Sequence, residues 1–243
     1  MSEGDAALAA RIALEAWHLL DRLRETSGFE GKALGAAGDA EANRLILDAL
    51  AAARPDDAVL SEEAADDPAR LAARRVWIVD PLDGTREYAE GRDDWAVHIA
   101  LAIDGAPAIG AVAAHGLVYA SDPAPAVPAP APACIVVSRS RAPAVAAGVA
   151  AALGADLHPM GSAGAKAMAV VRGEAIAYVH AGGQHEWDNC APVAVALAAG
   201  LHASRLDGAP LVYNSGPGTL LPDLLIATPE AAAAILAILR DDP

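Results

Sequence analysis

Two carboxylates stand three residues apart where an apolar segment runs into a turn, and this arrangement could hold a metal ion. The segment from Trp77 to Thr85 reads WIVDPLDGT, in which a proline fixes its own φ and a glycine permits a tight bend. Asp80 and Asp83 can therefore converge, and Leu82 adds a backbone carbonyl, an oxygen of the kind that Mg²⁺ accepts. Thr85 follows at an expected helix start, where its hydroxyl could orient a water molecule. An ordinary surface turn with a threonine cap fits the same residues, so the turn alone leaves both interpretations open.

Three further stretches carry residues that could complete such a site. Glu62 follows a short apolar strand and stands in a run of acids. Asp188 precedes an Ala/Val-rich helix that we expect from Pro192 to Ala199, with Gly200 after it. Asp39 precedes a helix that we expect from Ala40 to about Ala53. Each stretch also has a plain structural interpretation, because acidic runs are usually solvated and an Asp at a helix start is usually a cap.

Together these stretches resemble the inositol monophosphatase and fructose-1,6-bisphosphatase superfamily of magnesium-dependent, lithium-sensitive phosphatases. The segment Asp-Pro-Leu-Asp-Gly-Thr is similar to the signature of that superfamily, Glu62-Glu63 to its Gly-Glu-Glu segment, and Trp187-Asp188 to its second signature. The segment from Ala36 to Asp39 is similar to its Thr-x-Ala-Asp segment, with Ala36 in place of the threonine. The resemblance implies two or three Mg²⁺ ions held by Glu62, Asp80, Leu82, Asp83 and Asp188.

The implied chemistry is hydrolysis of a phosphate monoester by a metal-activated water. Metal ions would carry the charge of the transferring phosphoryl group, because protein groups alone stabilise it little. Thr85 and Asp39 would form the catalytic relay that orients and deprotonates the water, without a covalent enzyme intermediate.

The residues after Thr85 resemble one subgroup, the CysQ-type 3'-phosphoadenosine 5'-phosphate phosphatases. Arg86 begins an Arg-Glu-Tyr pattern typical of that subgroup, and a basic residue there suits a second phosphate. The segments from Val136 to Arg141 and from Gly161 to Lys166 resemble its Ser-Arg-Ser and Gly-Ser-x-x-Lys segments, the latter with one extra residue before the lysine. The implied substrate-binding residues are Glu62, Leu82, Asp83, Gly84, Thr85, Arg86, Ser138, Arg139, Gly161, Ser162, Lys166 and Asp188.

The subgroup implies removal of the 3'-phosphate from 3'-phosphoadenosine 5'-phosphate, a by-product of sulfate assimilation, with the 5'-phosphosulfate as a further substrate. The alternatives are an inositol-1-phosphate or fructose-1,6-bisphosphate phosphatase with the same site, and a nucleotide-binding regulator without turnover.

The amino-acid composition and net charge limit the kinds of molecule that this chain is expected to bind. The net charge of −15, from 32 acids and 17 bases, disfavours nucleic acid polymers and anionic membranes, so a small anionic substrate must find its attraction locally. The sequence shows neither a membrane-spanning apolar run nor a signal peptide, and we expect no membrane insertion. Cys134 and Cys190 lie far apart in sequence, which favours a reducing cytoplasm. A homodimer is left open.

The elements predict a protein in two halves, of class α+β or α/β. Residues 1–120 should form an α+β half with an antiparallel sheet, starting with an amphipathic helix from Asp5 to about Glu25. Asp104-Gly105 indicates a hairpin between apolar segments at 95–103 and 108–114. Residues 121–133 are an Ala/Pro-rich connection, and residues 134–243 should form an α/β half with a helix near 142–153. The superfamily resemblance implies a layered α-β-α-β-α sandwich.

Overall fold

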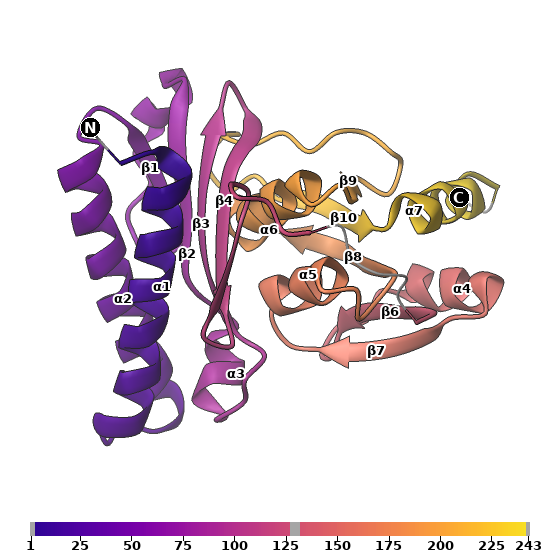
Figure 1. The fold of residues 1–243 in the computed structure, drawn as a ribbon, viewed down its shortest axis with the longest axis horizontal. Coiled ribbons are helices and arrows are strands. Elements are labelled where there is room, and N and C mark those ends of the chain that lie inside the picture. The colour runs from indigo at the N-terminus through magenta and orange to yellow at the C-terminus, as the bar shows by residue number, and fades with distance from the viewer. Residues whose placement is uncertain (1–2, 127–131, 242–243) are drawn as a thin grey trace.

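Five layers of helix and sheet make up the molecule, and they follow one another across Figure 1. The structure is a computed structural model, and it describes residues 3–126 and 132–241. Two long helices cover the outer face of the first sheet, two helices lie between the sheets, and two more cover the outer face of the second sheet. The expected α-β-α-β-α sandwich is confirmed.

The first half carries a sheet that is antiparallel apart from one strand pair. Its elements are α1 (Asp5–Thr26), α2 (Gly31–Ala53), β1 (Ala58–Ser61), η1 (Pro68–Ala72), β2 (Arg75–Asp83), α3 (Thr85–Ala89), β3 (Ala96–Ile103), β4 (Ala106–Ala114) and β5 (Leu117–Ala120). The strands are ordered β1-β2-β3-β4-β5, and only β1 and β2 run parallel. Asp104 and Gly105 form the turn of the β3–β4 hairpin with φ values of 52° and 79°, as their sequence predicts.

The second half carries a mixed sheet. Its elements are β6 (Cys134–Ser138), α4 (Ala144–Leu153), β7 (Asp156–Met160), α5 (Ala163–Val171), β8 (Ala177–Gln184), α6 (Glu186–Ala198), β9 (His202–Ser204), β10 (Leu221–Ala227) and α7 (Pro229–Asp241). The strands are ordered β7-β6-β8-β10-β9. Strand β6 runs parallel to both of its neighbours, and β10 runs antiparallel to both of its own.

Three apolar cores hold the layers together, and alternate side chains of one strand can belong to two different cores. On β2, Trp77 and Val79 face the core under α1 and α2, whereas Val76 and Ile78 face the central core around α5 and α6. Successive side chains on a strand point to opposite faces, so a sheet covered on both sides needs an unbroken apolar run. The carboxylates of the Asp-Pro-Leu-Asp segment therefore emerge from a strand that is anchored on both faces.

Two expected helices begin earlier than the sequence indicated. Helix α2 starts at Gly31, so Asp39 lies inside it and does not cap it, contrary to the prediction. Helix α6 starts at Glu186 and includes Pro192, whereas we expected the helix to begin at Pro192. The amphipathic helix and the helix near 142–153 are confirmed as α1 and α4. Part of the predicted Ala/Pro-rich connection, residues 127–131, lies outside the described residues.

Candidate active site

The Asp-Pro-Leu-Asp segment forms an irregular end of β2. Asp80 pairs with His98 on β3, and Asp83 pairs with Ala96. An interval of three residues on β2 therefore lies opposite an interval of two residues on β3. This extra residue is a β-bulge, which bends the strand and redirects its side chains. Leu82 N donates to Asp80 Oδ1 at 3.0 Å. Both carboxylates are buried, with 1% of Asp80 and 8% of Asp83 exposed.

Helix α5 and β3 supply the groups that hold Asp83. The amides of Ala163 and Gly164 donate to its two oxygens at 3.2 and 2.6 Å. His98 Nε2 lies 3.2 Å from Asp83 Oδ2 but off the line of a hydrogen bond, so this contact is an ion pair when the ring is protonated. His98 Nδ1 lies 3.1 Å from the carbonyl oxygen of Trp187, an arrangement that suits a protonated ring. Burial opposes ionisation of Asp83, but the charge of His98 and these hydrogen bonds outweigh it and lower the pKa.

Asp188 and Glu62 approach from other segments. Asp188 lies in the first turn of α6, where its Oδ2 accepts a hydrogen bond from His185 N at 2.7 Å. Glu62 follows β1, and its amide donates to the carbonyl of Val79 on β2 at 3.2 Å. Burial, together with the charge of Asp83, raises the pKa of Asp188 to about 6. Partial burial and the charge of Asp188 raise the pKa of Glu62 to about 7, although its side chain still reaches solvent.

We call Glu62, Asp80, Asp83 and Asp188 the carboxylate cluster. Burial, and then the charges of the other three members, raise the pKa of Asp80 well above its usual range. In Glu62, Asp80 and Asp188, repulsion between the carboxylates adds to burial in raising the pKa, and an opposing charge would relieve that repulsion. Four carboxylates are oxygen donors of the kind that Mg²⁺ accepts, so the donor set fits the metals that the sequence implied.

The carboxylates are not gathered around an ion position in this arrangement. No three His, Cys, Asp or Glu side chains of residues 3–126 and 132–241 lie close enough together to hold a metal. Asp80, Asp83 and Asp188 instead accept hydrogen bonds from backbone amides. Metal binding would require these side chains to exchange some of those bonds for the ion.

The predicted relay residues are in contact. Thr85 begins α3 after Gly84, whose φ of 90° favours glycine. Thr85 Oγ1 lies 3.3 Å from Asp39 Oδ1 and 3.1 Å from the carbonyl oxygen of Leu82. A hydroxyl has one hydrogen, so it serves only one of these acceptors well at a time. Burial, and then the charge of Glu63, raise the pKa of Asp39 to about 7, which brings its titration into the neutral range.

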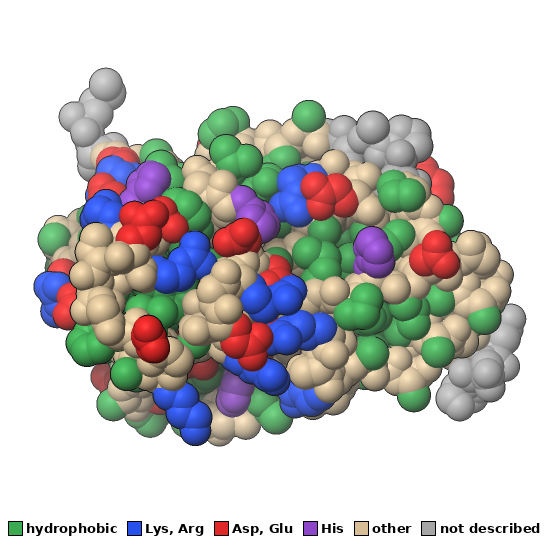
Figure 2. Space-filling view, turned by 90° about the horizontal axis from the view of Figure 1, so that it is seen from below, with side chains coloured by type: hydrophobic (Ala, Val, Ile, Leu, Met, Phe, Trp, Pro, Cys, Tyr) green, Lys and Arg blue, Asp and Glu red, His purple; other side chains and the backbone are tan. Residues whose placement is uncertain are grey.

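A cavity of about 260 Å³ opens beside Asp83 and Asp188. Arg86 from α3, Lys166 from α5 and Arg141 after β6 contribute its positive charges. In Figure 2, which views the molecule from the α3 and β7 side of Figure 1, blue side chains gather in the middle of the face. Glu87 adds a third carboxylate to the lining, and the other polar or small residues around the cavity include Gly84, Ser138, Ser140, Gly161, Ser162, Tyr178 and His180. Three basic side chains are therefore gathered at this cavity, beside three carboxylates, on a chain with a net charge of −15.

The structure brings most of the predicted substrate-binding residues to this cavity. Ser162 caps α5 and accepts a hydrogen bond from Ala165 N at 3.0 Å. Lys166 is 3% exposed, and its Nζ donates to the carbonyls of Gly161 and Ser162. Burial lowers the pKa of Lys166 to about 8. Arg139 is not among the residues that line the cavity, because its guanidinium turns toward acids of α3 and the segment after it.

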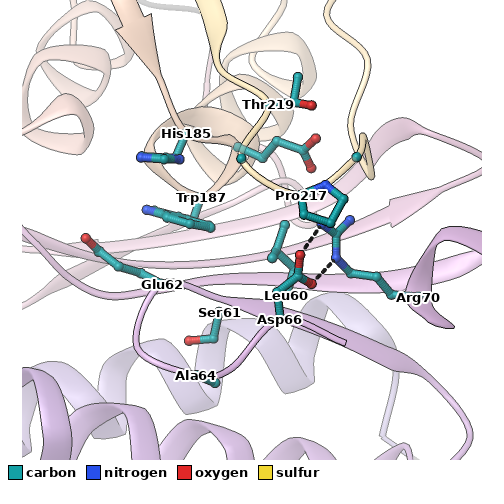
Figure 3. A pocket seen from close by; sticks show the side chains of 13 residues that line it. Leu60, Ser61, Glu62, Ala64, Asp66, Arg70, His185, Trp187, Pro217 and Thr219 are labelled. Carbon is teal, nitrogen blue, oxygen red and sulfur yellow. Dashed lines mark hydrogen bonds and ion pairs between the residues drawn. The ribbon is translucent and has the colours of Figure 1, made fainter. Parts of the chain in front are cut away.

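Beside Glu62, a second pocket of about 170 Å³ is bordered by a partly buried polar network (Figure 3). Arg70 pairs with Asp66 at 2.6 Å and donates to Asn214 Oδ1 and the Ser215 carbonyl at 2.8 and 3.0 Å. Glu186, at the start of α6, accepts from the amides of Asn214 and Ser215, both at 2.7 Å. This network ties the segment after Glu62 to the helix that carries Asp188.

Sequence reasoning missed His98 and His180 and gave Arg141 no separate role. The two histidines interrupt apolar strand segments, and a polar residue within such a run was the available signal. The contact between His98 and Asp83 depends on the pairing of β2 with β3, which a single sequence does not show.

Comparison with known proteins places this site in a family. A model of the inositol monophosphatase family matches residues 3–242. The chain belongs to the inositol monophosphatase family. Enzymes of this family depend on metal ions, in agreement with the donor set of the carboxylate cluster.

Within the inositol monophosphatase family, this chain is similar to curated proteins of one subgroup. A Mycobacterium leprae protein named 3'-phosphoadenosine 5'-phosphate phosphatase is 49% identical, over 98% of this chain and 94% of its own length. A Mycobacterium bovis protein of the same name is 51% identical, over 93% and 90%. The 3'(2'),5'-bisphosphate nucleotidase CysQ of Escherichia coli is 33% identical, over 79% and 84%.

Solved structures share the architecture of the chain. CysQ from Bacteroides thetaiotaomicron aligns with a TM-score of 0.74 at 26% identity, over 92% of this chain and 97% of that one. Inositol monophosphatase II from Staphylococcus aureus aligns with a TM-score of 0.77 at 21% identity, over 94% and 92%, which shows a shared fold. Within the described part of the chain, every helix is too short or too polar to cross a membrane.

Proposed function

We propose that this chain is a metal-dependent phosphomonoesterase that hydrolyses the 3'-phosphate of 3'-phosphoadenosine 5'-phosphate, giving AMP and phosphate. The observation that carries the proposal is identity of 49% and 51% with relatives named for this activity, over 98% and 93% of the chain. The carboxylate cluster, the contact between Thr85 and Asp39, and the three basic side chains of the cavity supply groups that such a reaction needs. The 5'-phosphosulfate analogue is expected as a second substrate.

Hydrolysis of a phosphate monoester needs positive charge around the phosphoryl group that is transferred. In this chain, metal ions held by the carboxylate cluster would supply that charge. Two or three Mg²⁺ ions bound to the carboxylate cluster and the Leu82 carbonyl would act as Lewis acids on the phosphate and make a bound water more acidic. Asp80 and Asp83 are fixed by the β2 bulge, and Asp188 by the start of α6, so these donors come from rigid elements.

The remaining residues handle the proton and the substrate. The Thr85 hydroxyl would orient the attacking water. Asp39, whose Oδ1 lies 3.3 Å from Thr85 Oγ1, would receive the proton. A base with a pKa of about 7 is well matched to neutral conditions, because it is substantially ionised yet still basic. Arg86 and Lys166 line the same cavity as Asp83 and Asp188, so they are available to bind the rest of the substrate.

Phosphate release from three substrates tests the proposal. The purified chain is assayed with 3'-phosphoadenosine 5'-phosphate, inositol 1-phosphate and fructose 1,6-bisphosphate, each with Mg²⁺ and with EDTA. We expect release that requires Mg²⁺ and favours the adenosine bisphosphate. A preference for inositol 1-phosphate or fructose 1,6-bisphosphate would assign the chain to another activity on the same site. Binding of the nucleotide without phosphate release would instead favour a regulator.

The Asp83→Asn variant is the inactive control, because it keeps the shape of a buried side chain and removes a charge from the carboxylate cluster. Substantial activity in that variant would overturn the metal assignment. The number of metal ions, the homodimer and the cytoplasmic location stay predictions.

A further inference from the structure

One cation of the cavity beside the carboxylate cluster has no partner. Arg86 Nε donates to Glu90 at 2.7 Å, and Lys166 Nζ donates to the Ser162 carbonyl at 2.6 Å. The Arg141 guanidinium makes no hydrogen bond or ion pair with any residue of 3–126 and 132–241, although it lines the same cavity. Its charge is therefore available to a ligand.

The neighbouring arginine, which the Ser-Arg-Ser pattern favoured, is already engaged. Arg139 Nε donates to Glu87 at 2.6 Å and its Nη2 donates to Glu90 at 2.7 Å. Arg86 also forms an ion pair with Glu90. The two arginines and the two glutamates therefore balance in charge, and these four side chains carry no excess of positive charge. Among the described residues of the cavity lining, Arg141 is the arginine whose guanidinium is not already held by a carboxylate.

A local turn places Arg141 at the cavity. Ser138 Oγ accepts a hydrogen bond from Arg141 N at 3.2 Å and lies 3.3 Å from Ser140 Oγ. Burial lowers the pKa of His180, and the charges of Lys166 and Arg141 lower it further, so Arg141 acts electrostatically on the cavity lining. Ser138, Ser140 and His180 all line the cavity with Arg141. A free guanidinium thus stands with two hydroxyls at one side of the cavity.

We propose that Arg141, with Ser138 and Ser140, binds the phosphate of the substrate that does not react, the 5'-phosphate of the adenosine bisphosphate. The inference rests on the proposed function. A phosphate monoester carries a charge of about −1.5 to −2 at neutral pH, and a guanidinium can meet it with two parallel hydrogen bonds. The reacting 3'-phosphate is left to the carboxylate cluster, so the two ends of the substrate are bound by groups of different chemistry.

Two substrates that differ by one phosphate test this assignment. Adenosine 3'-phosphate keeps the reacting group and lacks the 5'-phosphate. We expect Arg141→Gln to lower kcat/KM for the adenosine bisphosphate by about 10- to 100-fold, the range for a charged hydrogen-bonding group. The same variant should change kcat/KM for adenosine 3'-phosphate by less than about 2-fold, because replacing an exposed arginine by an uncharged residue disturbs the fold little. Arg141→Lys should recover part of the loss.

Control variants separate this site from general charge effects. Arg74→Gln removes an arginine with a 75% exposed side chain from the other end of β2, and it should leave both substrates unaffected. Arg139→Gln should reduce activity on both substrates alike, because Arg139 holds Glu87 and Glu90. Equal losses on both substrates in Arg141→Gln, or no loss on either, would overturn the proposal.

Binding of AMP tests the subsite without turnover. AMP carries only the phosphate that we assign to Arg141, so calorimetry should show affinity about 10- to 100-fold weaker for Arg141→Gln than for the unmodified chain. Unchanged AMP affinity would refute the subsite even if the adenosine bisphosphate is hydrolysed. Weakened AMP binding in a chain that does not hydrolyse the bisphosphate would keep the subsite and refute the proposed function instead.

Discussion

The proposed proton path depends on the hydroxyl group of Thr85. Its oxygen lies within reach of both Asp39 Oδ1 and the Leu82 carbonyl, at 3.3 and 3.1 Å. When Asp39 is ionised, the hydroxyl can donate to it and present its lone pairs to a water. When Asp39 is protonated, its own O–H can donate to Thr85, and the carboxyl can no longer accept a proton. The protonation state of Asp39 therefore decides whether the relay can work.

The first prediction concerns the pH dependence of this relay. Because the pKa of Asp39 is raised to about 7, kcat should rise with pH through about 7 as the carboxyl ionises. Asp39→Asn should lower kcat by at least about 100-fold, the usual contribution of a general base, and remove that limb. Asp48→Asn, an exposed Asp on the same helix α2, is the matched control and should leave the profile unchanged. An unaltered pH limb in Asp39→Asn would assign it to another group.

The second prediction is that Lys166 makes the free energy of unfolding depend on pH in the alkaline range. Burial lowers its pKa from 10.5 to about 8, although Asp83, Glu87 and Asp94 act to raise it. Between about pH 8 and 10.5 the unfolded chain then holds more protons at this site than the folded chain, so the free energy of unfolding should rise with pH. For a side chain that is 3% exposed, the gain should be about 3 kcal/mol over the window.

Comparing variants isolates this effect from other alkaline titrations. Lys166→Met cannot titrate, so the unmodified chain should gain stability relative to it between pH 8 and 10, measured by denaturant unfolding. Lys32→Met, at an exposed position, should show no such difference from the unmodified chain. A parallel pH dependence of Lys166→Met and the unmodified chain would mean that Lys166 keeps an ordinary pKa.

At the scale of elements, the site is assembled by contacts between segments far apart in sequence. The buried guanidinium of Arg70 joins η1 to the connection before β10, and Glu186 joins that connection to α6. Figure 3 shows Arg70 and Glu62 at opposite ends of the same pocket. The network therefore fixes the loop of Glu62 relative to the helix of Asp188.

The third prediction follows from that network. Arg70→Met should reduce the free energy of unfolding by about 3 kcal/mol, because it leaves Asp66 and the oxygens of Asn214 and Ser215 without their partner. Arg74→Met, where the side chain is 75% exposed, should change stability by less than about 0.5 kcal/mol. Chemical denaturation measures both. A loss in Arg70→Met no larger than in Arg74→Met would mean that the network adds nothing to stability.

The sequence predicted local motifs better than the helix boundaries around them. The Asp-Pro-Leu-Asp-Gly-Thr segment indicated the family correctly, and the Asp104-Gly105 hairpin is confirmed, because both depend on neighbouring residues. The metal role of the segment stays a prediction. The start of α2 was wrong, because glycines at 35 and 38 argue against a helix. A Cβ at Gly35 would lie 2.8 Å from Thr85 Cγ2, and one at Gly38 would lie 3.0 Å from Leu82 Cδ2. These glycines serve the close approach of α2 to the site, a tertiary contact that local propensity does not contain.

At the scale of the whole molecule, the layers bring four carboxylates from separate elements into one region, without gathering them around a single ion position. Asp80 and Asp83 lie at the end of β2 in the first sheet, Asp188 lies in the first turn of α6 in the central layer, and Glu62 follows the edge strand β1. The three apolar cores hold these elements in place regardless of the repulsion between their carboxylates. Part of the stability from apolar burial thus offsets an electrostatic cost that the site imposes.

The last prediction is that Mg²⁺ removes this cost in a pH-dependent way. The raised pKa values, about 6 for Asp188 and about 7 for Glu62, mean that the folded metal-free chain binds more protons there than the unfolded chain. That contribution to stability is complete below about pH 4, and it is lost as pH rises through 6 and 7. Mg²⁺ competes with those protons, so it should stabilise the chain at pH 7.5 and hardly at all at pH 5.

Thermal unfolding with Mg²⁺ or EDTA at the two pH values measures this effect. Saturation about 100-fold above Kd adds about 2.7 kcal/mol, which for a chain of this size raises Tm by about 5 to 10 °C at pH 7.5. Asp188→Asn should raise the Tm of the EDTA form, because it relieves the repulsion, and should shrink the Mg²⁺ shift. An equal Mg²⁺ shift at both pH values, or a full shift in Asp188→Asn, would place the stabilising ion away from the carboxylate cluster.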